Sequence, residues 1–119
     1  MRGFKRTERV SGEVHRVLAE EVREVKDPRV GPLSITSVNV TDDLRLARVR
    51  IVPLGGVGDA ESLLEGLRAA SGFLSRRLAK KLRMKYSPKL EFFLDDSLEQ
   101  AFQIVDQLNA QEEDSQEED

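Results

Sequence analysis

LRAASGFLSRRLAKKLRMKY (residues 67–86) decides the fold, because two helical patterns go out of phase within it at a glycine. Residues 60–70 repeat leucine and alanine at helical spacing, and a second helix is predicted from Phe73 to about Met84. Glycine lacks a Cβ atom, so a kink at this point would let two helices cross closely. The predicted kink consists of Ala70, Ser71 and Gly72.

The second helix of this pair has an apolar side and a cationic side. Leucines anchor one arc, whereas the opposite arc of about 160° holds five cations, and Phe73 and Met84 fall inside the same arc. The cations of that arc are Arg76, Arg77, Lys80, Lys81 and Arg83. Like charges four residues apart cost about 0.2–0.5 kcal/mol per pair. No acid occurs between Gly66 and Leu90 to offset that cost, so the pattern favours a phosphate backbone as partner.

Along the whole chain, too, positive and negative charges are separated. The formal net charge is −3, with 19 Lys and Arg against 22 Asp and Glu. Residues 1–94 contain all 19 cations and 12 acids, a net +7, whereas residues 95–119 contain 10 acids and no Lys or Arg. A basic body followed by an acidic end indicates a polyanionic partner.

The other elements follow from periodicity and from turn residues. The expected elements are a helix over 6–26, strands over 34–40, 46–52 and 90–94, and a helix over 95–109. Asp27-Pro28 should end the first helix, Asp59 should cap the helix at 60–70, and the first two strands should pair as a hairpin. Residues 110–119 contain six acids and no apolar side chain larger than alanine, so we expect a disordered acidic tail.

The order helix, strand, strand, helix, kink, helix, strand predicts an α+β domain. A bent helix pair with a basic second helix, packed on a three-stranded sheet, is typical of a KH-like RNA-binding core, here residues 1–94. The helix junction of a KH domain carries a GxxG loop that clamps the nucleic-acid backbone, and this junction lacks one. Gly55-Gly56-Val57-Gly58 matches GxxG, but it lies between a strand and a helix and is interpreted as a turn.

Several classes of function are excluded by what the sequence lacks. It has no cysteine, no apolar run long enough to cross a membrane and no signal peptide, which indicates a cytoplasmic protein. His15 is the only histidine and has neither a nucleophile nor metal-ligand spacing around it. We therefore expect no enzyme activity, no metal, no cofactor, no membrane partner and no small-molecule substrate.

Other charged or aromatic residues are weaker candidates. Arginines in the first helix alternate with glutamates at four-residue spacing, which predicts a salt-bridged surface and leaves only Lys5 and Arg6 as spare charge. Arg48 and Arg50 form a second basic patch on one face of their strand, either for RNA or as ordinary surface charge. Phe73 and Met84 could stack on bases, although we favour an inward position for Phe73.

Three ordered segments of the chain resemble one known family. They are RVSGEVHRVLAEEVREVKDPRV, ITSVNVTDDLRLARVRI and LRAASGFLSRRLAKKLRMKYSPKLEFFLDDSLEQAFQI. Their most specific pieces are Asp27-Pro28-Arg29, Asp43-Leu44 and Ala70-Ser71-Gly72. Over residues 4–108 the sequence resembles bacterial ribosome-binding factor A. This resemblance implies a type II KH fold in which an Ala-x-Gly kink replaces GxxG.

The resemblance also implies a function without catalysis. Family members bind the free small ribosomal subunit and its rRNA, assist late maturation and rRNA processing, and matter in cold adaptation; we expect a monomer. The expected rRNA-binding residues are Arg76, Arg77, Lys80, Lys81, Arg83 and Lys85, with Lys5, Arg6, Arg45, Arg48 and Arg50 as less secure additions. A protein-interaction module using the last helix and the tail, or a generic KH-like binder of single-stranded RNA, remain the alternatives.

Overall fold

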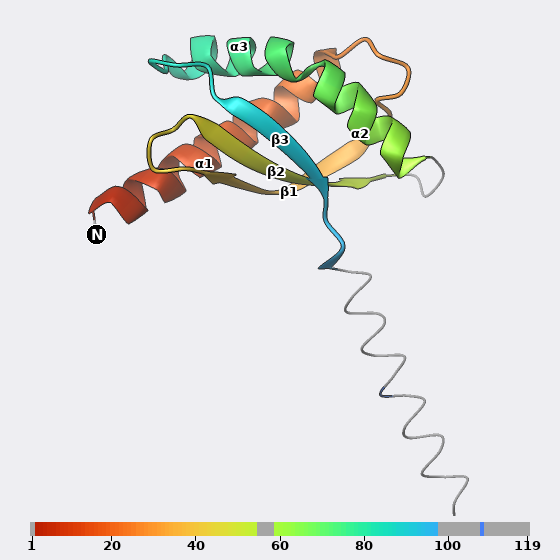
Figure 1. Cartoon of the computed structure of the whole chain (residues 1–119), viewed down its shortest axis with the longest axis horizontal. Helices are drawn as coiled ribbons and strands as arrows, with labels where there is room; N and C mark the ends of the chain where they lie inside the picture. The colour runs from red at the N-terminus through yellow and green to blue at the C-terminus, as the bar shows by residue number, and fades with distance from the viewer. Residues whose placement is uncertain (1, 55–58, 98–107, 109–119) are drawn as a thin grey trace, which may run out of the picture.

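The structure, a computed structural model, describes residues 2–54, 59–97 and 108. The helical elements are α1 (Arg2–Glu21), a short 3₁₀ helix η1 (Val22–Glu24), α2 (Ala60–Ala69) and α3 (Ser71–Leu82). The strands are β1 (Leu33–Val40), β2 (Leu46–Pro53) and β3 (Lys89–Leu94). These elements form two layers, with the helices on one face of a three-stranded sheet (Figure 1). The predicted α+β class is therefore confirmed.

β2 is the central strand of the sheet. It pairs antiparallel with β1, with Val38 opposite Val49, and parallel with β3, with Val49 opposite Phe92. The register of β1 shifts between Ile35 and Ser37. Parallel neighbours need a crossover, which here consists of α2 and α3. The predicted hairpin is thus present, and the crossover fixes the bent helix pair over the same sheet.

The core lies between this sheet and the helices. Ala47, Val49 and Ile51 alternate along β2 and are fully buried. From the other layer, Leu74 and Leu78 of α3 join α1 side chains in the same hydrophobic cluster. Residues of the strands that alternate with the buried ones are exposed or half-buried. The second face of the sheet is therefore not covered by any helix within the described part of the chain.

The ends of two helices test the turn signals. The first helix ends earlier than its apolar periodicity predicts: α1 stops at Glu21, one 3₁₀ turn follows, and Val25 is already extended with φ −73° and ψ 121°. Asp27 then closes a turn by accepting hydrogen bonds from the backbone N–H and side chain of Arg29. The predicted cap of α2 is confirmed, because Asp59 Oδ1 accepts from the Glu61 N–H at 3.0 Å.

α2 and α3 are separated at one residue, Ala70 (φ −88°, ψ −1°), and α3 begins at Ser71 rather than at Phe73. The expected reason for the glycine was wrong. A Cβ atom on Gly72 would meet only the Arg76 Nη1 atom, at 3.3 Å, so no helix crosses closely there. The close approach is at Gly66 instead, where a Cβ atom would lie 2.8 Å from Val30 Cγ2 and 3.1 Å from Arg29 Cβ.

Three predictions fall on residues outside the described part of the chain. They are most of the helix over 95–109, the acidic tail over 110–119, and the Gly55–Gly58 loop.

Candidate nucleic-acid interface

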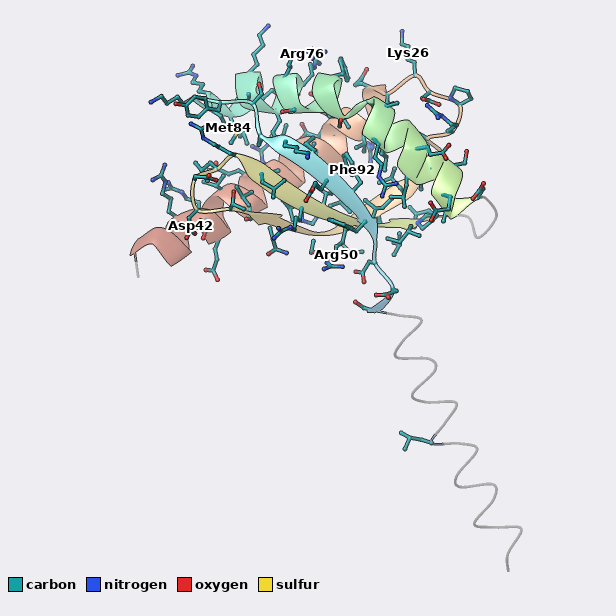
Figure 2. All side chains as sticks on the ribbon, viewed as in Figure 1. Lys26, Asp42, Arg50, Arg76, Met84 and Phe92 are labelled. Atoms are coloured by element: carbon teal, nitrogen blue, oxygen red, sulfur yellow. The ribbon has the colours of Figure 1, made fainter. Side chains whose placement is uncertain are left out.

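The outer side of α3 is a cationic surface held in place by the core. Leu74 and Leu78 are fully buried, and the buried Ser75 hydroxyl donates a hydrogen bond to the Pro88 carbonyl. These contacts turn Arg76 and Lys80 away from the sheet, and both are exposed. Figure 2 shows Arg76 on the outer side of α3. Among the described residues no carboxylate lies within 4.0 Å of either cation, so both are available to a phosphate.

Arg77 and Lys81 lie at the edge of α3 that faces α1, and their environment corrects the sequence-based expectation. Lys81 Nζ is 2.6 Å from one carboxylate oxygen of Glu21, and Arg77 Nε is 3.0 Å from the other. Lys81 also lies 3.9 Å from Glu20. The expectation that no acid neutralises the basic side of α3 is therefore wrong at Arg77 and Lys81.

Glu21 is a residue of the candidate site that sequence reasoning missed. Its side chain is only 2% exposed, whereas the two cations that bind it are nearly half exposed. The hydrogen bond from Lys81 is the main cause that lowers the pKa of Glu21; burial opposes it, and Arg77 lowers it further. The signal was available, because Glu21 lies four residues after Val17 and three after Leu18, on the buried side of α1.

Beyond α3 the chain reverses through a left-handed residue. Arg83 has φ 52° and ψ 46°, and its side chain is exposed, as is that of Lys85. Arg83, Lys85 and Arg6 line one cavity of about 370 Å³ between α1 and this loop. Arg45 lies beside it, with its guanidinium carbon 4.2 Å from the centre of the Tyr86 ring. The structure thus brings four of the predicted cations together; Lys5 lies in α1, but its side chain is not described.

Arg48 and Arg50 lie on a different surface. They alternate with the buried residues of β2 and therefore project from the uncovered face of the sheet, opposite the helices. Figure 2 shows Arg50 on the side of the sheet away from Arg76. Arg48 Nε is 3.7 Å from a Glu91 oxygen, and the Arg50 guanidinium is 5.9 Å from the Phe93 ring centre. The predicted RNA-binding residues are thus divided between two faces of the molecule.

The two apolar candidates, Phe73 in α3 and Met84 in the loop after it, differ from each other. Phe73 is 39% exposed, and the Arg77 guanidinium lies 5.8 Å from its ring centre. The favoured inward position of Phe73 was therefore wrong. Met84 is partly buried and packs against the core.

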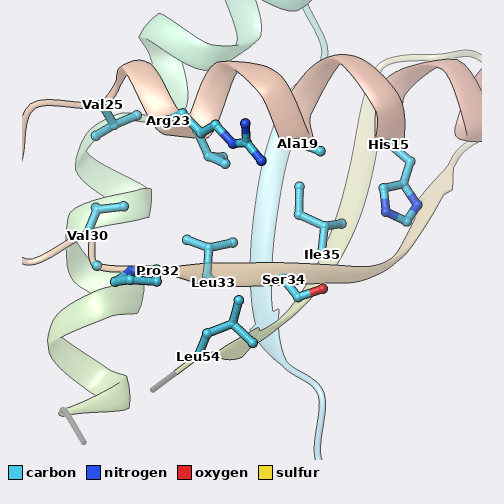
Figure 3. A pocket seen from close by; sticks show the side chains of 12 residues that line it. His15, Ala19, Arg23, Val25, Val30, Pro32, Leu33, Ser34, Ile35 and Leu54 are labelled. Atoms are coloured by element: carbon cyan, nitrogen blue, oxygen red, sulfur yellow. The ribbon is translucent and has the colours of Figure 1, made fainter. Parts of the chain in front are cut away.

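A further cavity, of about 630 Å³, lies between the end of α1 and the start of β1. Figure 3 shows His15 of α1 and Arg23 of η1 reaching towards β1, among mostly apolar side chains such as Ile35 and Leu54. Within the residues that the structure describes, no three His, Asp or Glu side chains are arranged to hold a metal ion. In the same part of the chain, no helix is both long enough and apolar enough to cross a membrane.

Comparison with known sequences shows that this chain is similar to the members of one protein family. The sequence model of the family described as Ribosome-binding factor A matches residues 6–108. The Ribosome-binding factor A of Acetivibrio thermocellus is 39% identical over 108 residues, which cover 89% of this chain and 88% of the relative. That of Nitrosomonas eutropha is 42% identical, with 85% and 87% covered, and that of Clostridioides difficile is 38% identical, with 94% of both covered.

Solved structures agree with the sequence comparison. The crystal structure of ribosome-binding factor A from Thermus thermophilus has a TM-score of 0.67 and 28% identity, over 74% of this chain and 94% of that one. The solution structure of a Thermotoga maritima protein described as a putative ribosome binding factor A has a TM-score of 0.66 and 28% identity, over 74% and 85%. A homology model of the Thermus protein, fitted into a cryo-EM map of its 30S complex, has a TM-score of 0.61 and 29% identity, over 72% and 91%.

Proposed function

Because this chain belongs to the ribosome-binding factor A family, we propose that it binds the free small ribosomal subunit through rRNA and assists late subunit maturation and rRNA processing. The family is a ribosome-binding factor family rather than an enzyme family, and we propose no catalytic step for this chain. The 30S complex of the Thermus protein supports the choice of the small subunit as partner.

The observation that carries this proposal is the outer side of α3. Arg76 and Lys80 are one turn apart, exposed, and without an acid within 4.0 Å among the described residues. A helix side that keeps like charges together without compensation is suited to phosphates, which supply affinity and position the protein. Selectivity would come from the shape of the rRNA, because A-form helices are recognised mainly by shape and backbone.

The remaining cations have graded roles in this proposal. Arg77 and Lys81 are held by Glu21 and border the contact surface rather than forming its centre. Arg83 and Lys85, with Arg6 and Arg45, extend the surface beyond the end of α3. Lys5 precedes them in α1. Arg48 and Arg50 would reach RNA only on the opposite face of the sheet.

The architecture supports a type II KH domain whose helix junction has lost the GxxG clamp. The two helices meet at Ala70 with no loop between them, so backbone amides of a GxxG loop are replaced as phosphate ligands by side chains of α3. We further propose that the chain acts as a cytoplasmic monomer, without metal, cofactor or small-molecule substrate, and that its role is largest during cold adaptation.

Co-sedimentation with purified small subunits tests the proposal. The double variant Arg76→Glu with Lys80→Glu should abolish sedimentation with the subunit while leaving the far-UV circular dichroism spectrum unchanged, because both side chains are exposed. For the wild type, neutralising five phosphates predicts that log affinity falls against log salt with a slope of roughly −3.5 to −4.5.

The matched control is Arg16→Glu with Arg23→Glu, which changes the net charge equally but alters exposed positions of α1 and η1. This control should sediment like the wild type. If both double variants lose binding equally, net charge rather than the α3 surface governs association. An affinity that does not depend on salt would contradict rRNA as the partner.

A further inference from the structure

A second feature of the molecule has the character of a ligand site. The cavity of about 370 Å³ at the end of α3 is formed by three segments that are distant in sequence: the first half of α1, the turn before β2, and the loop after α3. We call it the Tyr86 cavity. Pockets that enclose small ligands span about 300–1,000 Å³, so its volume suits one nucleotide rather than an oligomer.

An aromatic platform stands at the rim of the Tyr86 cavity. The Tyr86 side chain is 45% exposed, although large aromatic side chains are usually more buried. The guanidinium of Arg45 lies 4.2 Å from the ring centre and the ammonium of Lys85 lies 5.4 Å from it. Unpaired RNA bases stack on tyrosine rings and on arginine planes, so one base can be added to the stack that Tyr86 and Arg45 already form.

Positive charge surrounds the same platform. The lining contains the cations Arg6, Arg9, Arg83 and Lys85 and the acids Glu13 and Asp43. The cations come from both α1 and the loop after α3, so a phosphate between these segments would meet charge from two sides. This combination of a flat aromatic surface with a cationic wall is how single-stranded nucleic acids are held.

The two acids do not cancel this charge. Asp43 is used within its own turn: its Oδ1 atom accepts from the Thr41 hydroxyl at 2.7 Å and from the Arg45 N–H at 3.1 Å. These hydrogen bonds, that of Thr41 first, lower the pKa of Asp43 and keep the turn that presents Arg45 intact. Glu13 stays at the α1 wall, where a carboxylate can accept from an exocyclic amino group of a base.

The backbone of the rim is held in an unusual conformation. Leu44 (φ 60°) and Arg83 (φ 52°) are the two non-glycine residues with positive φ in the described chain, and both line this cavity. Hydrogen bonds fix them, from Leu44 N–H to the Thr41 carbonyl at 2.8 Å and from Met84 N–H to the Ala79 carbonyl at 2.9 Å. Such strained residues cluster at ligand sites, where they preorganise the binding surface.

We propose that the Tyr86 cavity binds one unstacked nucleotide of the rRNA. Its base stacks on the Tyr86–Arg45 platform, and its phosphate lies among Arg6, Arg83 and Lys85. This inference rests on the proposed function, because the rRNA of the small subunit supplies the nucleotide. It adds recognition of an unpaired position to the phosphate contacts of α3.

The chain contains one tyrosine and no tryptophan, so tyrosine fluorescence reports on Tyr86 alone. The full-length protein is titrated at low salt with a cytidine oligoribonucleotide of five residues, and emission is corrected against free tyrosine amide at equal absorbance. Stacking should quench the emission saturably. An abasic oligomer of equal length, which offers phosphates without bases, should leave the emission unchanged.

Two variants then connect the cavity to the subunit. Tyr86→Ala should weaken binding to small subunits by roughly 5- to 160-fold, the range for loss of one stacked base. Tyr86→Phe keeps the ring and should bind like the wild type. The matched control is Phe93→Ala, because Phe93 is also exposed and also faces an arginine, Arg50, but lies on the uncovered face of the sheet.

Each outcome has a defined meaning. Saturable quenching together with loss for Tyr86→Ala alone supports the nucleotide site. Equal quenching by the abasic oligomer, equal loss for Tyr86→Phe, equal loss for Phe93→Ala, or full subunit binding by Tyr86→Ala overturns it. In these cases the proposed function stands as long as the wild type binds small subunits, whereas a wild type that does not bind them overturns the proposed function itself.

Discussion

Glu21 links the core of the molecule to its cationic surface. Its carboxylate is buried under α3 and accepts from Lys81 at 2.6 Å and from Arg77 at 3.0 Å. A buried carboxylate that keeps its charge needs such partners, because desolvation alone would favour the neutral acid. Arg77 and Lys81 therefore stabilise a buried carboxylate, which Arg76 and Lys80 do not. The same arc of α3 thus holds two cations that are paired within the protein and two that are exposed without such a partner among the described residues.

We predict that Glu21→Gln lowers the free energy of unfolding by about 1–2 kcal/mol at neutral pH, because charge-assisted hydrogen bonds are lost from half-exposed cations. The pKa of Glu21 is lowered in the folded protein, so the stabilisation is present above the unfolded value of 4.5 and is lost as pH falls through the folded value. Urea unfolding at neutral pH and at about pH 3 should show the two proteins converging in acid.

The neighbouring Glu20→Gln is the control for this prediction. The Glu20 side chain is 58% exposed and lies 3.9 Å from both Arg16 and Lys81, so its removal should change stability by less than about 0.5 kcal/mol. A constant difference between Glu21→Gln and the wild type at all pH values would contradict the titration of Glu21 in this range.

At the residue scale, the sequence indicated which side chains to consider, but not which other side chains surround them in the fold. The absence of acids between Gly66 and Leu90 was the reason for choosing α3, but it did not reveal that an acid from α1, far away in the chain, reaches Arg77 and Lys81. Likewise Phe73 has a large apolar side chain of the kind found in protein cores, and only the packing of α3 shows that it is exposed. Both errors arise from contacts between elements, which a local pattern does not contain.

At the scale of elements, the contact between α2 and the turn after α1 depends on Gly66. This glycine lies inside a helix, where it costs about 1 kcal/mol relative to alanine, and the close approach of Arg29 and Val30 explains its presence. Asp27 holds that turn through Arg29, which lowers the pKa of Asp27 to about 2, and Arg29 also lies 3.7 Å from Glu65 of α2. The segment after α1 is thus fastened directly to α2.

We predict that Gly66→Ala destabilises the protein by about 1–3 kcal/mol despite the better helix propensity of alanine, because its Cβ would overlap Val30. Gly72→Ala, in the first turn of α3, should be neutral or stabilising by up to about 1 kcal/mol, since only the flexible Arg76 side chain is near. Urea unfolding of both variants measures the difference; equal effects would show that neither glycine serves a close contact.

Element positions were largely predictable, and their ends less so. The predicted strands agree with β1, β2 and β3 to within one residue at each end. β-Branched residues indicated the first strand, and alternation indicated the second, because β2 has one buried and one uncovered face. The end of α1 was placed too late, since Val22 and Val25 continue the helical spacing although the chain has already left the α-helix. The junction at Ala70 was expected, but the role given to Gly72 belongs to Gly66.

At the scale of the whole molecule, the fold is completed by β3. Among the residues that the structure describes, the buried hydrophobic residues of the core run from Val14 to Phe92. The two-layer arrangement followed from the order of elements in the sequence, whereas the central position of β2 and its parallel pairing with β3 did not, because strand order depends on how the crossover packs. This same order separates Arg48 and Arg50 from the cations of α3.

We predict that removal of residues 110–119 leaves the free energy of unfolding unchanged, because the segment has no apolar side chain larger than alanine. The deletion removes six acids and changes the formal net charge from −3 to +3, so binding to unrelated RNA at low salt should increase. Urea unfolding and filter binding measure the two effects. A lower unfolding midpoint would show that the acids stabilise the basic body.

The pairing of β3 along β2 also has a consequence during synthesis of the chain. The ribosome makes the hairpin of β1 and β2 first, so one edge of β2 stays unpaired until β3 has been translated. Open strand edges recruit other chains, and non-local parallel pairing is slow to form. The nascent chain is therefore most prone to aggregation after Pro53 has been synthesised and before Leu94 has been added. If the ribosome stalled in this interval, the incomplete chain would be released to chaperones or proteases.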